Sequence, residues 1–179
     1  RHTHLDQGGP TGEFKGSHEV EEILPWLKLS MELNPQAIRT YVVTAYWLSD
    51  LHQTNMAERV LLEGLRNNPT NPELLFELGR IYYDDYHEAE RARNVWEAAL
   101  QSWAHEEPGV PFEDRIKMTT ANFDSRFMYE QLQTRLAELE EDEGNYRKAI
   151  VRWEHVKQVS PDPAGIQKRI NALQKRGAD

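Results

Sequence analysis

Apolar residues recur at helical spacing along much of the chain, and the clearest stretch runs from Leu75 to Leu100. Its first part places residues at i, i+3, i+4 and i+7 on one face of a helix, namely Leu75, Leu78, Gly79 and Tyr82. A short polar break follows, and the rhythm resumes with Ala92, Trp96 and Ala99. The pattern predicts two antiparallel helices that cross closely at the small residues, while the large residues fill the seam.

The same spacing occurs in two further copies. Pro35 and Pro69 stand 34 residues apart and bracket a segment whose second helix carries Ala57, Leu61 and Gly64. A third copy is matched by Leu136, Ala137, Gly144, Tyr146, Ala149, Trp153 and Pro161. Helical patterning alone would suit a bundle equally well, but a shared register favours repeats. A single helix pair cannot bury its apolar face alone, so such units are expected to stack.

These residues resemble the tetratricopeptide repeat, whose pattern is W-x2-L-G-x2-Y, then A-x3-F, then P. Leu75 stands in place of the tryptophan, Trp96 in place of the phenylalanine, and one extra residue lies in the turn. The resemblance implies an all-α fold, an α-solenoid of antiparallel helix pairs wound as a right-handed superhelix. One helix, ERARNVWEAAL, also resembles the half-a-TPR repeat of RNA-processing scaffolds, but the 34-residue spacing and the run GNYRKAI favour the ordinary class.

Carried along the chain, this register predicts an extended arm over residues 1–17 and a repeat domain over 18–179. The domain divides into a partial repeat (18–35), two full repeats (36–69 and 70–103), an insertion (104–124), a third repeat (125–161) and a capping helix (162–179). The insertion is inferred because Trp103 and Pro161 are 58 residues apart, about two dozen more than one period. A loop of that length in a compact array is usually functional or disordered.

Four local expectations accompany this division. In the partial repeat, Pro25 is expected to kink or split the helix, whose inward face would carry Ile23, Leu27 and Met31. Asn55 is expected to start the next repeat's second helix, with Glu58 completing its N-cap. Asn71 is expected to cap a helix that begins at a proline. The acidic run ELEEDE (138–143) is expected to be a solvated helix end rather than a site for a hard cation.

Composition narrows the possible functions. The chain has 179 residues, 39% hydrophobic and 28% charged, which is typical of a folded soluble domain. A net charge of −9 disfavours nucleic-acid binding, because phosphate contacts need a basic face. No apolar run of about 18 residues occurs, so no membrane contact is expected from this segment. The chain contains no cysteine and does not begin with methionine, so an upstream signal or anchor and the localisation stay open.

The arm contains the motif HTHLD, with His2, His4 and Asp6. Amidohydrolases bind a divalent metal with an H-x-H pair at the end of a barrel strand, but no apolar strand precedes the pair here. Two alternatives therefore stay open beside an arm without a ligand: a metal-dependent enzyme and a non-catalytic zinc site. No catalytic triad, phosphate loop or HExxH motif is present, so no catalytic residue, metal or cofactor is predicted.

The resemblance implies a concave groove lined by the first helix of each repeat. The register places these groove positions at Arg39, Val42, Tyr46, Ser49, Asp50, Glu73, Phe76, Arg80, Tyr83, Asp84, Gln131, Thr134, Glu138, Glu141 and Asp142. The carboxylate-clamp variety needs lysine and asparagine where Val42 and Tyr46 stand, so that variety is excluded. Tyrosine and arginine are common hot spots, so the preferred partner-binding residues lie in the first two repeats: Arg39, Val42, Tyr46, Phe76, Arg80 and Tyr83. The alternative is that Tyr46 and Tyr83 only pack against a neighbouring helix or the N-terminal arm.

The predicted function is a non-catalytic scaffold that binds a peptide or protein segment in this groove. The first alternative is a self-assembling structural subunit, and therefore a homo-oligomer. The second is the metal site on the arm. The fold does not identify the partner, because function depends on the site and not on the architecture.

Overall fold

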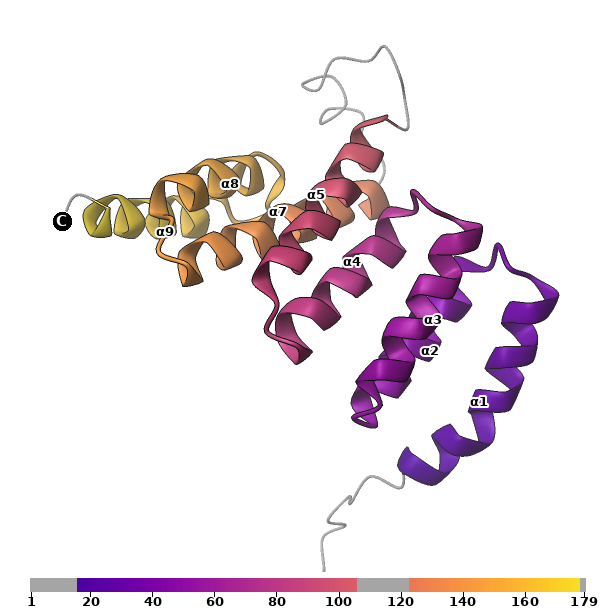
Figure 1. The fold of residues 1–179 in the computed structure, drawn as a ribbon. Helices are drawn as coiled ribbons and strands as arrows, with labels where there is room; N and C mark the ends of the chain where they lie inside the picture. The colour runs from indigo at the N-terminus through magenta and orange to yellow at the C-terminus, as the bar shows by residue number, and fades with distance from the viewer. Residues whose placement is uncertain (1–15, 106–122, 178–179) are drawn as a thin grey trace, which may run out of the picture.

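The computed structural model describes residues 16–105 and 123–177, and every regular element in these two ranges is a helix (Figure 1). In chain order they are α1 (Gly16–Leu33), α2 (Ile38–Asp50), α3 (Thr54–Asn67), α4 (Pro72–Arg80), the π-helical turn η1 (Ile81–Asp85), α5 (Ala89–His105), α7 (Phe123–Asp142), α8 (Tyr146–Val159) and α9 (Pro163–Arg176). The helices form an array of antiparallel pairs, with α1 at one end and α9 at the other. The predicted all-α solenoid is confirmed.

Three helix pairs build the array: α2 with α3, α4 and η1 with α5, and α7 with α8. The seam of the middle pair depends on Gly79, because a Cβ atom there would lie 2.2 Å from Nε1 of Trp96. That closeness lets the buried Trp96 indole donate a hydrogen bond of 3.0 Å to the carbonyl oxygen of Phe76. The inward residues predicted for this pair are buried: Leu75, Leu78, Gly79, Tyr82, Ala92, Trp96 and Ala99.

The extra residue predicted in the turn of this repeat has a structural explanation. Directly after α4 the chain forms η1, in which the amide of Tyr86 donates to the carbonyl of Ile81, five residues earlier, at 3.1 Å. A π-helical turn accommodates one more residue than an α-helical turn, so the repeat keeps its register on both sides. Such turns are frequent at functional sites, and this one carries Tyr83.

Each pair turns through one residue in the left-handed region of the backbone. These residues are His52 with φ 58°, His87 with φ 58° and Gly144 with φ 75°. After His52 and Gly144 the next amide bonds back to the last helical turn, from Gln53 to Leu48 and from Asn145 to Glu140, both at 2.8 Å. A left-handed residue with such a bond is a common way to end a helix.

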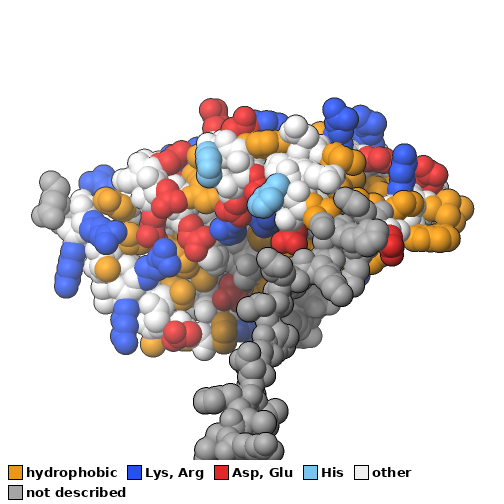
Figure 2. All heavy atoms as spheres, turned by 90° about the horizontal axis from the view of Figure 1, so that it is seen from below, with side chains coloured by type: hydrophobic (Ala, Val, Ile, Leu, Met, Phe, Trp, Pro, Cys, Tyr) orange, Lys and Arg blue, Asp and Glu red, His pale blue; other side chains and the backbone are white. Residues whose placement is uncertain are grey.

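The N-terminal helix differs from the expectation in two ways. Pro25 was expected to kink or split the helix; it lies within α1, which runs unbroken from Gly16 to Leu33, so the helix is not split. Met31 is buried as expected, but Ile23 is exposed, because α1 has no first helix of its own among the described residues to cover it. Figure 2 shows hydrophobic side chains gathered at this end of the array. The exposed apolar residues of α1 are Ile23, Trp26, Leu29 and Leu33.

Two of the cap predictions can be checked. Asn71 caps α4 as expected, because its Oδ1 accepts a hydrogen bond of 3.0 Å from the amide of Leu74. α3 begins at Thr54, next to the predicted start at Asn55, but the predicted N-cap is wrong, because Gln53 precedes the helix and no side chain caps it. Asn55 and Glu58 instead accept hydrogen bonds from the hydroxyl of Tyr86, because the next repeat packs against this end of α3.

The C-terminal helix α9, which was predicted as a capping helix, packs on α8 and buries Ile170 and Leu173. Its outer face is polar and carries Lys168 and Lys175, so α9 closes the apolar seam at this end of the array. Asp162 caps the helix by accepting a hydrogen bond of 2.9 Å from the amide of Gly165.

Two predicted features lie outside the described residues: the HTHLD motif and residues 106–122 of the predicted insertion. Within the described ranges, no helix is both long and apolar enough to span a bilayer. The same ranges contain no group of three or more histidine or acidic side chains arranged to hold a metal ion.

Candidate functional site

The predicted groove residues of the first repeat lie on α2. Tyr46 is 56% exposed and packs edge-on against Trp47, with ring centroids 5.6 Å apart. Arg39 is exposed, while Val42 is half-buried against the core. The helix turns its other face inward and buries Tyr41, Ala45 and Leu48, which is why Tyr46 stays accessible.

Four of the five predicted groove residues of the second repeat are half-buried, and the fifth, Asp84, is exposed. Phe76 is half-buried and packs against the core. Arg80 donates through Nε to Glu77 at 2.9 Å, and its buried Nη2 has no hydrogen-bond partner in the structure. The described hydrogen bonds and ion pairs join neither Arg80 nor Tyr83 to Arg39, Val42 or Tyr46.

Tyr83 makes contacts toward the third repeat. Its ring lies 5.7 Å from that of Trp96, and its hydroxyl donates a hydrogen bond to Asp142 at the end of α7. Burial of the ring raises the pKa of Tyr83, and the hydrogen bond and charge of Asp142 raise it further. The hydroxyl therefore stays protonated at neutral pH and acts as a donor to the carboxylate.

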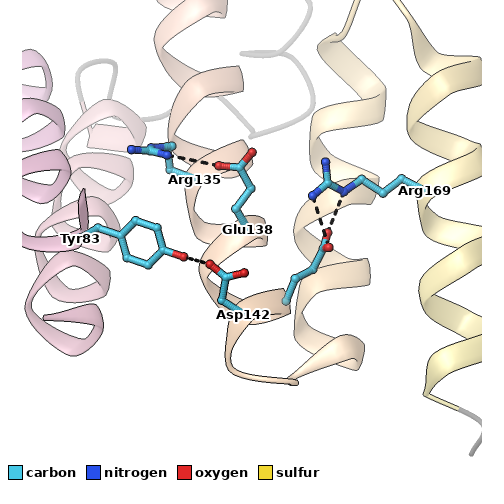
Figure 3. Close-up of a pocket in the computed structure, with 6 residues that line it drawn as sticks. Tyr83, Arg135, Glu138, Asp142 and Arg169 are labelled. Carbon is cyan, nitrogen blue, oxygen red and sulfur yellow. Dashed lines mark hydrogen bonds and ion pairs between the residues drawn. The ribbon is translucent and has the colours of Figure 1, made fainter. Parts of the chain in front are cut away.

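Tyr83 and Asp142 belong to the wall of a hollow of about 310 Å³ (Figure 3). Three elements contribute to it: η1, the last turns of α7, and α9. The lining residues are Tyr83, Arg135, Glu138, Glu141, Asp142 and Arg169. Four of these were predicted at groove positions of two neighbouring repeats, and the structure brings them together: Tyr83, Glu138, Glu141 and Asp142.

Arg135 is shared between two carboxylates on one side of the hollow. One end of its guanidinium donates to Asp84 of η1, and the other reaches Glu138 at 3.4 Å. Its central carbon lies 5.6 Å from the centroid of Tyr83 and 5.5 Å from that of Trp96. Arg135 thus ties α7 to the second repeat through both charge and aromatic contact.

Arg169 occupies the other side and is committed to Glu141. It donates through Nε at 2.8 Å and through Nη2 at 3.3 Å, a two-pronged pair that fixes the guanidinium plane. The same carboxylate accepts a hydrogen bond of 2.5 Å from the indole of Trp153, and Arg169 stacks over that indole at 4.3 Å. Both carboxylate oxygens of Glu141 therefore accept hydrogen bonds from within the protein.

The acidic run at the end of α7 is only partly the solvated helix end that the sequence suggested, because Asp142 and Glu143 are exposed but Glu140 is not. Glu140 is buried, with 3% of its surface exposed, and accepts hydrogen bonds from Arg93 at 3.1 Å and from Asn145 at 2.9 Å. Arg93 also pairs with Glu143. The prediction is wrong for Glu140 because α5 supplies an arginine to this helix end from 47 residues away in the sequence.

Sequence reasoning did not identify the two arginines that line this hollow, Arg135 and Arg169. Neither Arg135 nor Arg169 belongs to a motif of the repeat. An electrostatic argument could have identified these arginines. The acidic run ends a helix that has no basic residue in its last turn, so arginine or lysine side chains of neighbouring helices are expected to pair with it. Trp153 was predicted as a core residue and is buried, but its indole nitrogen points to Glu141 at the wall of the hollow.

A second hollow, of about 410 Å³, lies at the turn between α7 and α8. It is lined by Gly144, Asn145, Tyr146, Arg147, Lys148 and Gly177, which are mostly turn and helix-start residues. The hollow at Tyr83 is the better candidate site, because it joins three structural elements and has a fixed network of charged groups.

Comparison with known proteins places the fold and nothing further. No family model matches the sequence, and no curated protein matches it. Two crystal structures of MamA, a protein with the tetratricopeptide-repeat fold, are similar to the chain. The first gives a TM-score of 0.64 at 14% identity over 90% of this chain and 80% of MamA. The second gives 0.63 at 14% identity over 90% and 75%. The chain therefore has a TPR-like fold.

Proposed function

We propose that this protein is a non-catalytic interaction module that binds an extended or helical segment of another protein across its first helices. The observation that carries the proposal is the exposure of Tyr46, together with partly exposed Phe76, Arg80 and Tyr83 on the next first helix. A TPR-like array offers a continuous surface along such helices, and the resemblance to tetratricopeptide repeats implies that a partner binds there, which supports the proposal. Tyrosine and arginine supply large contacts that also form hydrogen bonds.

The two tyrosines support the proposal to different degrees. Tyr83 also stabilises the fold, because its ring contacts Trp96 and its hydroxyl donates a hydrogen bond to Asp142. Tyr46 has 56% of its surface exposed, although large aromatic residues are usually mostly buried. Tyr46 is therefore the residue whose removal tests binding with the least disturbance of the structure.

The test uses peptides selected from a random 12-residue phage library on the immobilised protein. Affinity of the selected peptides is then measured by fluorescence anisotropy for the wild type and for the Tyr46→Ala, Arg80→Glu double variant. We expect a loss of at least about tenfold, as a hot-spot residue would give. Met56→Ala is the matched control, because Met56 is 50% exposed but lies on α3, a second helix. Peptides that bind the double variant as tightly as the wild type would contradict the proposal.

A second candidate function is self-assembly, favoured by the exposed apolar residues of α1. Trp26 is 71% exposed and Leu33 is 77% exposed, and both lie on one stripe with Ile23 and Leu29. Sedimentation equilibrium of the wild type and of the Trp26→Glu, Leu33→Glu double variant tests this function. A mass above that of a 20.9 kDa monomer, lost in the variant, supports assembly through α1. A monomer in both rejects it.

A further inference from the structure

The hollow at Tyr83 has an uneven charge balance. Its lining contains two arginines and three carboxylates, and Arg135 also serves Asp84 outside the lining. Glu141 is matched by Arg169, whereas Glu138 has only a long contact of 3.4 Å to the shared Arg135. Asp142 accepts a hydrogen bond from the Tyr83 hydroxyl and pairs with no arginine or lysine among the described residues. The hollow therefore has an excess of negative charge at Glu138 and Asp142.

The position of these carboxylates on α7 strengthens the argument. Glu138 and Asp142 are four residues apart, so they share one face of the helix and repel each other. Both lie in the last turns of α7, where the helix dipole places partial negative charge, and no basic residue in the last turn of that helix compensates it. A cation placed between the two side chains would relieve the repulsion and interact favourably with the helix end.

The arginines, in contrast, have little capacity for an anion. Arg169 already binds Glu141 through two nitrogens, and Arg135 is divided between Asp84 and Glu138. An anionic ligand would have to displace one of these carboxylates and would meet Asp142 and Glu138 in the same hollow. The volume of about 310 Å³ is at the lower end of ligand pockets and suits a single side chain.

From this geometry we propose that the hollow binds a lysine side chain of the partner segment, with the ammonium group between Glu138 and Asp142. Lysine fits better than arginine because its ammonium is a compact point charge, whereas a planar guanidinium needs a two-pronged acceptor. The two-pronged carboxylate in the wall of the hollow, Glu141, is already occupied by Arg169. This inference rests on the proposed function, since it names one side chain of the bound segment.

The test is a nuclear magnetic resonance titration with three capped tripeptides: Ala-Lys-Ala, Ala-norleucine-Ala and Ala-Glu-Ala. The reporters are the amides at the end of α7 and the indole N–H signal of Trp153, which is bonded to Glu141 in the wall of the hollow. We expect only the lysine peptide to shift these signals. The outcome that overturns the proposal is an equal shift with norleucine, a shift with the glutamate peptide, or no shift with any of the three.

Variants separate charge from fold. Asp142→Asn keeps an acceptor for the Tyr83 hydroxyl but removes the charge, and it should weaken the lysine peptide by about fivefold, the upper range for an exposed ion pair. Glu63→Gln on α3 makes the same charge change on an exposed residue away from the hollow and should leave binding unchanged. Tyr83→Phe removes the competing hydroxyl and should keep or tighten binding. Undiminished binding by Asp142→Asn contradicts the proposal.

Failure of this inference is distinguishable from failure of the proposed function. If library peptides bind across Tyr46 and Arg80 but the lysine tripeptide does not shift the signals of the hollow, the proposed groove is supported and the proposed lysine site is rejected. If no library peptide is selected but the lysine tripeptide still binds, the lysine site is supported and binding across the first helices is rejected.

Discussion

The second and third repeats share one register, and one of their differences is a single methyl group in the seam between the two helices. Trp96 and Trp153 occupy the same position, as do Gly79 and Ala137. Without a Cβ at residue 79, the Trp96 ring lies against α4 and its indole bonds to the carbonyl of Phe76. In the third repeat the indole of Trp153 instead donates to Glu141. The direction of the tryptophan N–H group therefore differs between the two repeats together with the small residue of the first helix. With Gly79 the indole bonds to a backbone carbonyl, and with Ala137 it bonds to a carboxylate side chain.

A second difference concerns polarity. The positions of Leu75 and Tyr82 in the second repeat are taken by Gln133 and Glu140 in the third, and both polar residues are buried. Gln133 accepts a hydrogen bond from Arg152 at 3.4 Å, and Glu140 accepts one from Arg93. At these two positions the third repeat therefore has buried polar and charged side chains, where the second repeat has Leu75 and the ring of Tyr82.

The largest expected effect comes from exchanging the small residues of the two seams. Gly79→Ala places a Cβ 2.2 Å from Nε1 of Trp96 and 2.5 Å from its Cδ1, so the ring must shift. We expect the free energy of unfolding to fall by about 3 kcal/mol, the upper range for overpacking. The reciprocal change Ala137→Gly should lower it by only about 1 kcal/mol, since it introduces a flexible residue without a clash.

Urea denaturation of the two variants measures this difference. Equal losses in Gly79→Ala and Ala137→Gly would show that the approach of Trp96 to α4 does not distinguish the seams.

The next effect concerns the ionic seam of the third repeat. Glu140→Gln removes the charge from a buried partner of Arg93 and should lower the free energy of unfolding by about 2 kcal/mol. Glu143→Gln is the matched control, because Glu143 pairs with the same arginine but is 35% exposed, and its loss should stay below about 1 kcal/mol. Both values come from chemical denaturation, and a larger loss for Glu143→Gln would refute the assignment.

A smaller effect is expected at the turns. Gly144 has φ 75°, and a Cβ added there would have no atom within 4 Å. Gly144→Ala therefore tests backbone strain alone and should lower the free energy of unfolding by about 1 kcal/mol. His87, the corresponding residue of the second repeat, has φ 58°, and His87→Gly should leave stability unchanged or raise it by about 0.5 kcal/mol. Thermal denaturation compares the two, and a stabilising Gly144→Ala would argue against this turn geometry.

The smallest effect is a pH dependence confined to the third repeat. Burial lowers the pKa of His155 below its ordinary value of 6.5, and the neighbouring Arg152 lowers it further. The unfolded chain therefore binds a proton at higher pH than the folded one, and the free energy of unfolding falls as the pH drops below about 6.5. His155→Gln should flatten this slope, measured by denaturation between pH 7.5 and 5.5 in about half-unit steps. An unchanged slope would assign the dependence to another group.

The fold was predictable because its signals are local and periodic. Gly79, Ala92 and Trp96 are identified by spacing alone, and each lies where the pattern places it. Ile23 was mispredicted because the pattern assumes a neighbouring helix that α1 does not have among the described residues. Periodicity shows which face of a helix is apolar but not whether another helix covers it.

The candidate site was less predictable because it is made of charge pairs between distant residues. Register placed Tyr83 and Asp142 on the same kind of surface, but 59 residues separate them in the chain. Which arginine meets which carboxylate depends on the rotation of neighbouring helices, and that rotation depends on details such as η1. The π-helical turn was visible in the sequence only as one surplus residue.

The most direct test of the proposed interaction surface is hydrogen–deuterium exchange of the full chain with and without a selected 12-residue peptide. If the segment lies across the first helices, amide exchange should slow in α2, in α4 with η1 and at the C-terminal end of α7. Exchange in α3, α5 and α8 should stay unchanged. Slower exchange confined to α3, α5 and α8, or to α1 alone, would contradict binding across the first helices.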